Sequence, residues 1–189
     1  YPSRWLTQVQ PQGEDFDYLR QAFDTYSALR SLGLDVDIVR AGASLAGYKL
    51  VVVPSLPIVP ERLLAELKTT TAQIVLAPRC GSKVETARIP AELPPGVLHA
   101  LIPICVPRVE SLRPNVQEAV RFGDALYTCT RWREHLQADK GVAVEATFGG
   151  GGIAIARHRN VRYLAGCFDA ALTRALLTRA ARDVGLSPT

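Results

Sequence analysis

The sequence predicts an α/β fold in which a mostly parallel sheet carries helices on both faces. Over the first 80 residues, short apolar runs alternate with helical patterns, and the connections between them are short. Such alternation is typical of βαβ units, whose right-handed crossovers place helices on both faces of a parallel sheet. Because 189 residues with 48% hydrophobic content suit one well-cored unit, we expect a single domain over residues 1–189.

The first helix is predicted over residues 14–33. Aromatic and aliphatic side chains recur there at helical spacing, acidic residues lie in the first turn, and Gly33 suits a C-cap. Residues 34–39, "LDVDIV", alternate apolar and acidic side chains, which predicts a strand directly after the helix.

Two further strands and a helix complete this half of the chain. Residues 50–53 and 72–78 are continuous apolar runs, as expected of strands that are buried on both faces. Between them, Pro60 and Glu61 mark the start of a helix.

The second half of the chain has a different pattern. Residues 83–114 contain six prolines, so we expect an extended excursion with one helical turn near 97–101. Residues 129–137, "CTRWREHLQ", predict a short helix. The segments 142–148, 152–157 and 161–166 predict an antiparallel meander at one sheet edge near the C-terminus, and a helix over 169–185 closes the chain.

Composition and charge exclude several classes of protein. The net charge is +4, but the basic residues are scattered, so we expect no nucleic-acid partner. No apolar run is long enough to span a bilayer, so no membrane partner is expected either. The four cysteines form no CxxC pair, which predicts no metal site and no cofactor, and indicates reduced thiols in a cytoplasmic protein.

The stretch "VLAPRCGSK" is the strongest candidate for chemistry. Cys80 follows an apolar run and lies on a turn between Arg79 and Gly81, with Lys83 nearby. A thiol on a turn after a buried strand, beside cations, is one setting for a nucleophile. The alternative is that Cys80 is a small residue in a structural turn.

The glycines of "FGGGG", residues 148–152, raise a second alternative. A phosphate loop passes from a strand into a helix, so that the helix N–H groups meet the anion. The residues that follow here, "IAIAR", favour a strand instead, which makes a hairpin turn the better interpretation.

Several motifs in order resemble the trimerisation domain of glycoside hydrolase family 42 β-galactosidases. The resemblance covers most of the chain and is carried by residues 1–39, "LAGYKLVVVPSLPIV", "APRCGSK", "IPAELPPG" and "VESLRP". It implies a three-layer, flavodoxin-like fold related to class I glutamine amidotransferases. It also implies a homotrimer, a catalytic barrel elsewhere in the same parent chain that holds the two catalytic glutamates, and a role in carbohydrate metabolism.

This resemblance gives the leading hypothesis, a non-catalytic oligomerisation domain excised from a longer β-galactosidase chain. The family usually has a short strand before "YPSRW", so a first strand is expected to be missing from residues 1–189. Two alternatives stay open: an amidotransferase-like hydrolase that uses Cys80, and a ligand-binding module without chemistry.

Comparison with the amidotransferase pattern weakens the role of Cys80 as a nucleophile. Those relatives place the cysteine between two elbow glycines before a helix, and pair it with a histidine that has a glutamate two residues on. Here Pro78 and Ser82 stand in place of the glycines, and none of the three histidines has that acidic neighbour. We therefore expect no catalytic residue in this chain, with Cys80 as the weak candidate.

Contacts with other subunits are expected at the N-terminal segment and at the turn around Cys80. Aromatic residues and arginine are favoured at such contacts, which makes Arg4 and Trp5 candidates. Arg79 and Lys83 are expected in solvent or at a subunit contact.

Overall fold

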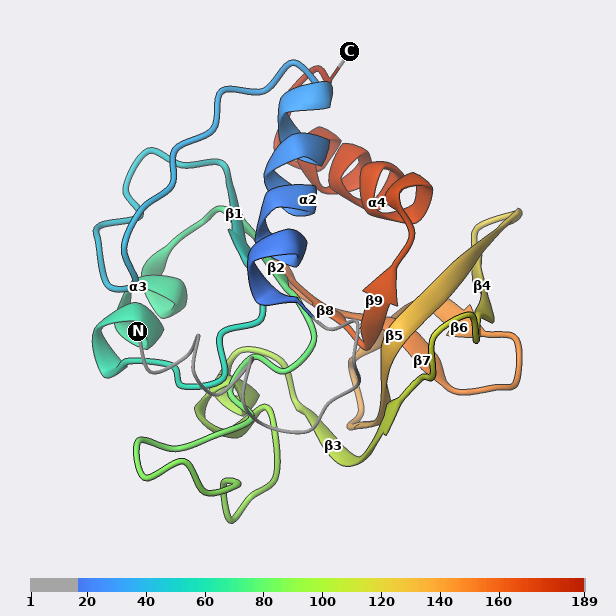
Figure 1. Ribbon diagram of the computed structural model, residues 1–189. Coiled ribbons are helices and arrows are strands. Elements are labelled where there is room, and N and C mark those ends of the chain that lie inside the picture. The colour runs from blue at the N-terminus through green and yellow to red at the C-terminus, as the bar shows by residue number, and fades with distance from the viewer. Residues whose placement is uncertain (1–16, 189) are drawn as a thin grey trace.

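One large sheet organises residues 17–188, the part of the chain that this computed structural model describes (Figure 1). In these residues the sheet has nine strands. In sheet order they are β1 (Leu50–Val53), β2 (Gln73–Leu76), β8 (Val161–Leu164), β7 (Ile153–His158), β6 (Ala143–Phe148), β4 (Glu118–Phe122), β5 (Ala125–Ala138) and β3 (Ile104–Ser111), with β9 (Gly166–Phe168) paired to β5.

The prediction of a mostly parallel sheet is wrong. Only β1–β2 and β2–β8 pair in parallel, whereas the six other pairings are antiparallel. The reason is that the middle of the chain supplies β3, β4 and β5, three strands that the sequence patterns did not predict. The meander of β6, β7 and β8 is confirmed, but it lies inside the sheet between β2 and β4 and not at an edge.

Three α-helices and one 3-10 helix are present in the described residues: α2 (Tyr18–Ser31), α3 (Glu61–Thr69), η1 (Gly96–Ala100) and α4 (Ala170–Arg182). All four were predicted, although residues 14–16 of the first predicted helix lie outside the described part. The side chain of Asp17 caps α2 by accepting hydrogen bonds from the Leu19 and Arg20 N–H groups. No helix in residues 17–188 is long and apolar enough to cross a membrane.

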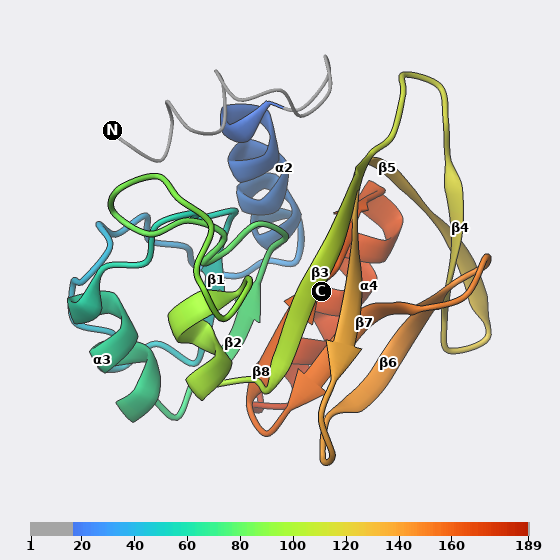
Figure 2. The ribbon, with the colours of Figure 1, turned by 90° about the horizontal axis from the view of Figure 1, so that it is seen from below.

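Helices cover both faces of the parallel strands, as Figure 2 shows with α3 on one side of β2 and α4 on the other. Val75 packs into the apolar cluster that contains Leu172 of α4. Its neighbour Ile74 belongs to a second cluster, with Leu63 of α3. This division explains why β2 is buried at every position, since a strand that is covered on both faces has no solvent side.

Residues 129–137 form part of the strand β5 and not a helix, so that prediction is wrong. β5 is 14 residues long and pairs with β3, β4 and β9. Pairing along both of its edges overrides the weak helical tendency of the sequence. Its turn with β4 consists of Gly123 and Asp124, a dipeptide that could have indicated a hairpin.

Residues 34–39 do not form the predicted strand. Leu34 and Val36 pack against the core, whereas Ile38 is 86% exposed. A strand needs a partner, and among the described residues the nearest strand, β1, pairs with β2 alone. The alternation of side chains therefore agrees with the burial of Leu34 and Val36 but not with that of Ile38, and it produces no ladder in the described residues.

A buried arginine joins the parallel strands to α4. The side chain of Arg162 on β8 is fully buried, and its Nε lies 2.8 Å from a carboxylate oxygen of Glu145 on β6. Its other nitrogens donate to Asp183, the C-cap of α4, and to Gln73 on β2 at 2.6 Å. One guanidinium therefore connects three strands and a helix end.

Replacing Arg162 by methionine should destabilise the fold strongly, because the carboxylates of Glu145 and Asp183 would lose their nearest cation and keep only Arg157, at 3.5 and 3.7 Å. We expect a loss of about 3–5 kcal/mol in the free energy of unfolding, measured by urea denaturation. Arg113→Met, at an exposed position, is the control and should change it by less than about 0.5 kcal/mol. Equal losses in the two variants would contradict the proposed role of Arg162.

Candidate functional site

The turn at residues 78–81 follows β2 directly and is held by the loop after β1. The hydroxyl of Ser55 donates to the Pro78 carbonyl at 2.8 Å, and the Gly81 N–H donates to the Leu56 carbonyl at 2.9 Å. Gly81 has φ +67°, and a Cβ there would lie 1.9 Å from the Pro95 carbonyl oxygen. Only glycine fits this position, so the turn is closely packed and rigid.

Cys80 points into the core of this turn. Its side chain is fully buried, its Sγ lies 3.4 Å from the Val53 carbonyl oxygen, and the Leu56 N–H donates to it at 3.3 Å. Burial raises the pKa of the Cys80 thiol to about 12. Because the thiolate is the nucleophilic form, both the burial and the raised pKa disfavour Cys80 as a nucleophile at neutral pH.

The three histidines of the chain are all described, and each has a partner other than Cys80. The Nε2 atom of His135 lies 2.8 Å from a Glu110 oxygen, and that of His99 lies 3.8 Å from Asp139. His158 contacts the Gly141 carbonyl through Nδ1 at 3.3 Å. The base that a cysteine nucleophile requires is therefore not in place in the described residues.

The structure corrects the prediction for Arg79. The side chain is only 4% exposed, and its guanidinium carbon lies 5.1 Å from the centre of the Trp132 ring, so the expectation that it faces solvent is wrong. Its backbone has φ +70°, which is unusual for a residue with a Cβ. Lys83 is half-buried, whereas Arg4 and Trp5 lie outside the described residues.

Glu134 is the residue of this site that the sequence did not reveal. Its side chain lies on β5 and is 1% exposed. One carboxylate oxygen accepts from the Arg79 N–H at 2.9 Å and from the Trp132 indole at 3.1 Å, and the other accepts from the Tyr163 hydroxyl at 2.7 Å. Burial raises the pKa of the Glu134 carboxyl, while these hydrogen bonds act in the opposite direction.

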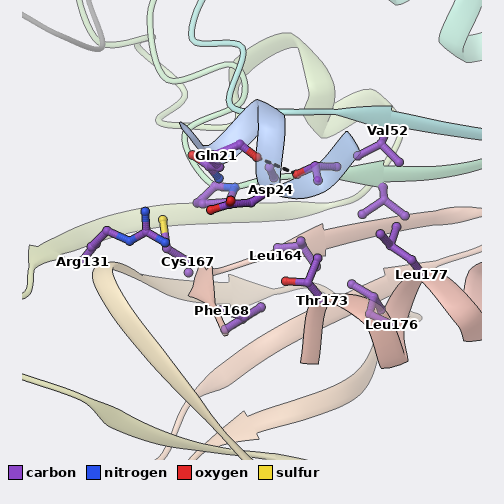
Figure 3. Close-up of a pocket in the computed structure, with 15 residues that line it drawn as sticks. Gln21, Asp24, Val52, Arg131, Leu164, Cys167, Phe168, Thr173, Leu176 and Leu177 are labelled. Carbon is purple, nitrogen blue, oxygen red and sulfur yellow. Dashed lines mark hydrogen bonds between the residues drawn. The ribbon is translucent and has the colours of Figure 1, made fainter. Parts of the chain in front are cut away.

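A cavity of about 60 Å³ lies beside this cluster, between α2, α4 and the ends of the parallel strands (Figure 3). Gln21, Arg131 and Cys167 lie at one end and Val52 and Leu177 at the other. Binding sites for small molecules usually have about 300–1,000 Å³, so this cavity has room for a few waters and not for a sugar. The described residues contain no cluster of His, Cys, Asp or Glu that could hold a metal ion.

The glycine-rich segment Phe148–Gly152 is a hairpin turn between β6 and β7, as predicted. The Phe148 N–H donates to the Gly152 carbonyl at 3.0 Å, and a guanidinium nitrogen of Arg133 donates to the Gly151 carbonyl at 2.7 Å. The same Arg133 pairs with Glu118 at 2.5 Å. In a phosphate loop, a helix follows the glycines and an anion binds to them. Here the strand β7 follows the glycines, and the guanidinium of Arg133 binds to them.

Comparison with known proteins identifies the family of this chain. The family model described as the β-galactosidase trimerisation domain matches residues 1–187. The chain is 43% identical over 188 residues to the β-galactosidase BgaA of a Thermus species, and 44% identical over 186 residues to the β-galactosidase of Thermus thermophilus. It covers 100% and 98% of its own length in these matches, but only 29% and 28% of the two relatives.

Solved structures agree with this result. The crystal structure of the β-galactosidase from the psychrophilic Marinomonas ef1 matches 99% of this chain and 28% of its own, with a TM-score of 0.94 and 32% identity. A glutamine amidotransferase crystal structure matches 87% of this chain and 94% of its own, with a TM-score of 0.58 and 14% identity. The second likeness concerns the fold alone.

Alkylation of the native protein with iodoacetamide at pH 7 should modify Cys105 first. Cys105 is half-buried, whereas Cys80, Cys129 and Cys167 are buried free thiols. Burial also raises the pKa values of Cys80 and Cys129. Peptide mass spectrometry should find these three cysteines modified only after unfolding in urea. The same measurement is made on the unmodified protein and on a Cys105→Ser variant. Fast labelling of Cys80 in either native protein would contradict the expectation that this thiol is unreactive.

Proposed function

Because the chain belongs to the trimerisation-domain family of glycoside hydrolase family 42 β-galactosidases, we propose that it is the non-catalytic oligomerisation domain of a longer enzyme. The parent is a β-galactosidase-like glycoside hydrolase of carbohydrate metabolism, and its catalytic barrel lies elsewhere in the same chain. The match over residues 1–187 carries this proposal, together with coverage of less than a third of each β-galactosidase relative. The buried, unassisted Cys80 agrees with it.

The domain acts through its geometry. A rigid α/β unit buries surface against copies of itself and holds the parent enzyme as a homotrimer. Arg4, Trp5 and Lys83 are the proposed contact residues. Arg79 lies inside the protomer and acts indirectly, since its backbone N–H anchors the turn that leads to Lys83.

The architecture is a three-layer, flavodoxin-like one, extended by the antiparallel strands. The parallel strands β1, β2 and β8, with α3 on one face and α2 and α4 on the other, support this relationship. The likeness to a glutamine amidotransferase fold supports it as well. Four free cysteines favour a cytoplasmic location for the parent.

The alternative, an amidotransferase-like hydrolase that uses Cys80, is not favoured. The thiol is buried, and none of the three histidines contacts it. The cavity beside the turn, of about 60 Å³, is smaller than a monosaccharide requires, so it gives no support to a sugar-binding module.

Removal of the domain should abolish trimer formation in the parent enzyme. A parent in which a flexible linker replaces residues 1–187 should sediment as a monomer, whereas the intact parent sediments as a trimer. Hydrolysis of a nitrophenyl galactoside by the shortened parent shows that its barrel is folded. Residues 1–189 alone should not hydrolyse this substrate. A shortened parent that is active and still trimeric would contradict the proposal.

We also propose that a further strand of the parent chain pairs with the outer edge of β1. Three of the four β1 residues, Leu50, Val51 and Val52, are only partly buried, although the run is as apolar as β2. In the segment before β1, Ile38 is 86% exposed and Val39 is 44% exposed. An added strand would cover the β1 side chains and pair with the N–H and C=O groups of its outer edge, which have no strand partner in the described residues.

Hydrogen exchange tests this strand. Amides of β1 should exchange about tenfold more slowly in the intact parent than in residues 1–189 alone, because an added hydrogen bond must open first. Amides of β2, which is paired on both sides, should exchange equally in the two proteins. Equal exchange at β1 in both proteins would show that its edge stays open.

A further inference from the structure

We propose that the turn after β2, together with Trp132 and Tyr163, forms a carboxylate-binding pocket that the chain fills with its own Glu134. Three donors converge on one carboxylate: the Arg79 N–H at 2.9 Å, the Trp132 indole at 3.1 Å and the Tyr163 hydroxyl at 2.7 Å. A carboxylate with hydrogen bonds to both oxygens matches this donor set, since an ionised carboxylate only accepts.

The donors are held in place by contacts that do not involve Glu134. The turn that presents the Arg79 N–H is fixed to the loop after β1 by the Ser55 hydroxyl and the Gly81 N–H. Tyr163 lies in the centre of the sheet, where β8 pairs with Leu76 of β2 and Ala156 of β7. The pocket is therefore preorganised, and we expect it to survive removal of the Glu134 side chain.

The carboxylate enters from a strand that does not belong to the parallel part of the sheet. Glu134 lies on β5, beside a register shift between Thr130 and Arg133, and its N–H donates to the Ala165 carbonyl at 2.6 Å. The Arg79 turn, in contrast, lies at the carboxyl end of a central parallel strand, where open α/β sheets bind their ligands. An internal side chain thus occupies the ligand position of the sheet.

The size of the side chain defines the ligand class. Truncation of Glu134 to alanine removes one methylene and the carboxylate, which correspond to the atoms of acetate. The vacated pocket should therefore take small monocarboxylates such as acetate. It should discriminate against acetamide, whose N–H₂ group would face donors instead of acceptors.

The test uses the intact parent enzyme with Glu134→Ala, probed by hydrogen exchange in peptides that cover residues 76–82 and 160–165. The variant should exchange faster than the unmodified parent. Sodium acetate at about ten times its dissociation constant should slow exchange by about tenfold, because binding multiplies the equilibrium constant between the closed and the open state by 1 + [L]/Kd. Acetamide, or sodium chloride at the same ionic strength, should have no such effect.

Glu134→Gln is the matched control, because its side chain still fills the pocket. Acetate should leave the exchange of this variant and of the unmodified parent unchanged. Equal protection by acetate and acetamide, or equal protection of the Ala and Gln variants, would overturn the proposal.

If Glu134→Ala does not fold, the same question is answered by refolding it from urea. Greater recovery of folded protein in acetate than in chloride would support the pocket, and equal recovery would overturn it. The proposal does not depend on the oligomeric state, so its failure would leave the assembly function unaffected.

Discussion

The buried carboxylate of Glu134 is the polar interaction that joins the turn after β2 to β5 and β8. It is buried, and it accepts hydrogen bonds from the turn after β2, from β5 and from β8. Removing it would leave the Arg79 N–H and the Tyr163 hydroxyl buried without this acceptor, which is costly in a low-dielectric interior. The parallel and antiparallel parts of the domain therefore meet at a polar joint as well as through apolar packing.

The same joint helps to close the turn at the end of β2. The turn there is closed by Gly81 against Pro95, by Ser55 against Pro78, and by Glu134 against Arg79. Its thiol points into the core and not toward a cleft. The turn after β2 is therefore closed by contacts from three separate segments of the chain.

A second polar joint, centred on Arg162, ties α4 to the strands at a different set of residues. Unlike Glu134, Arg162 is paired with two carboxylates, so its charge is compensated by Glu145 and Asp183. Both joints link residues that are far apart in the sequence, such as Arg79 with Glu134 and Gln73 with Arg162. The hydrogen-bond partners of Glu134 and Arg162 could not be predicted from the sequence, because no helical or strand periodicity connects residues so far apart in the chain.

Sequence patterns by themselves determined the elements whose burial follows a local period. The apolar runs at β1 and β2, the helical patterns of α3 and α4, the prolines around η1 and the ordered family motifs were sufficient to predict these elements and the family. The tertiary structure decided whatever depends on a partner. It made residues 129–137 a strand through pairing with β3, β4 and β9, and left residues 34–39 without a ladder. It also placed Arg79 inside the protein and brought Glu134 to it. The physical reason is that hydrogen-bond partners and desolvation are set by contacts between distant segments, which the local alternation of side chains does not encode.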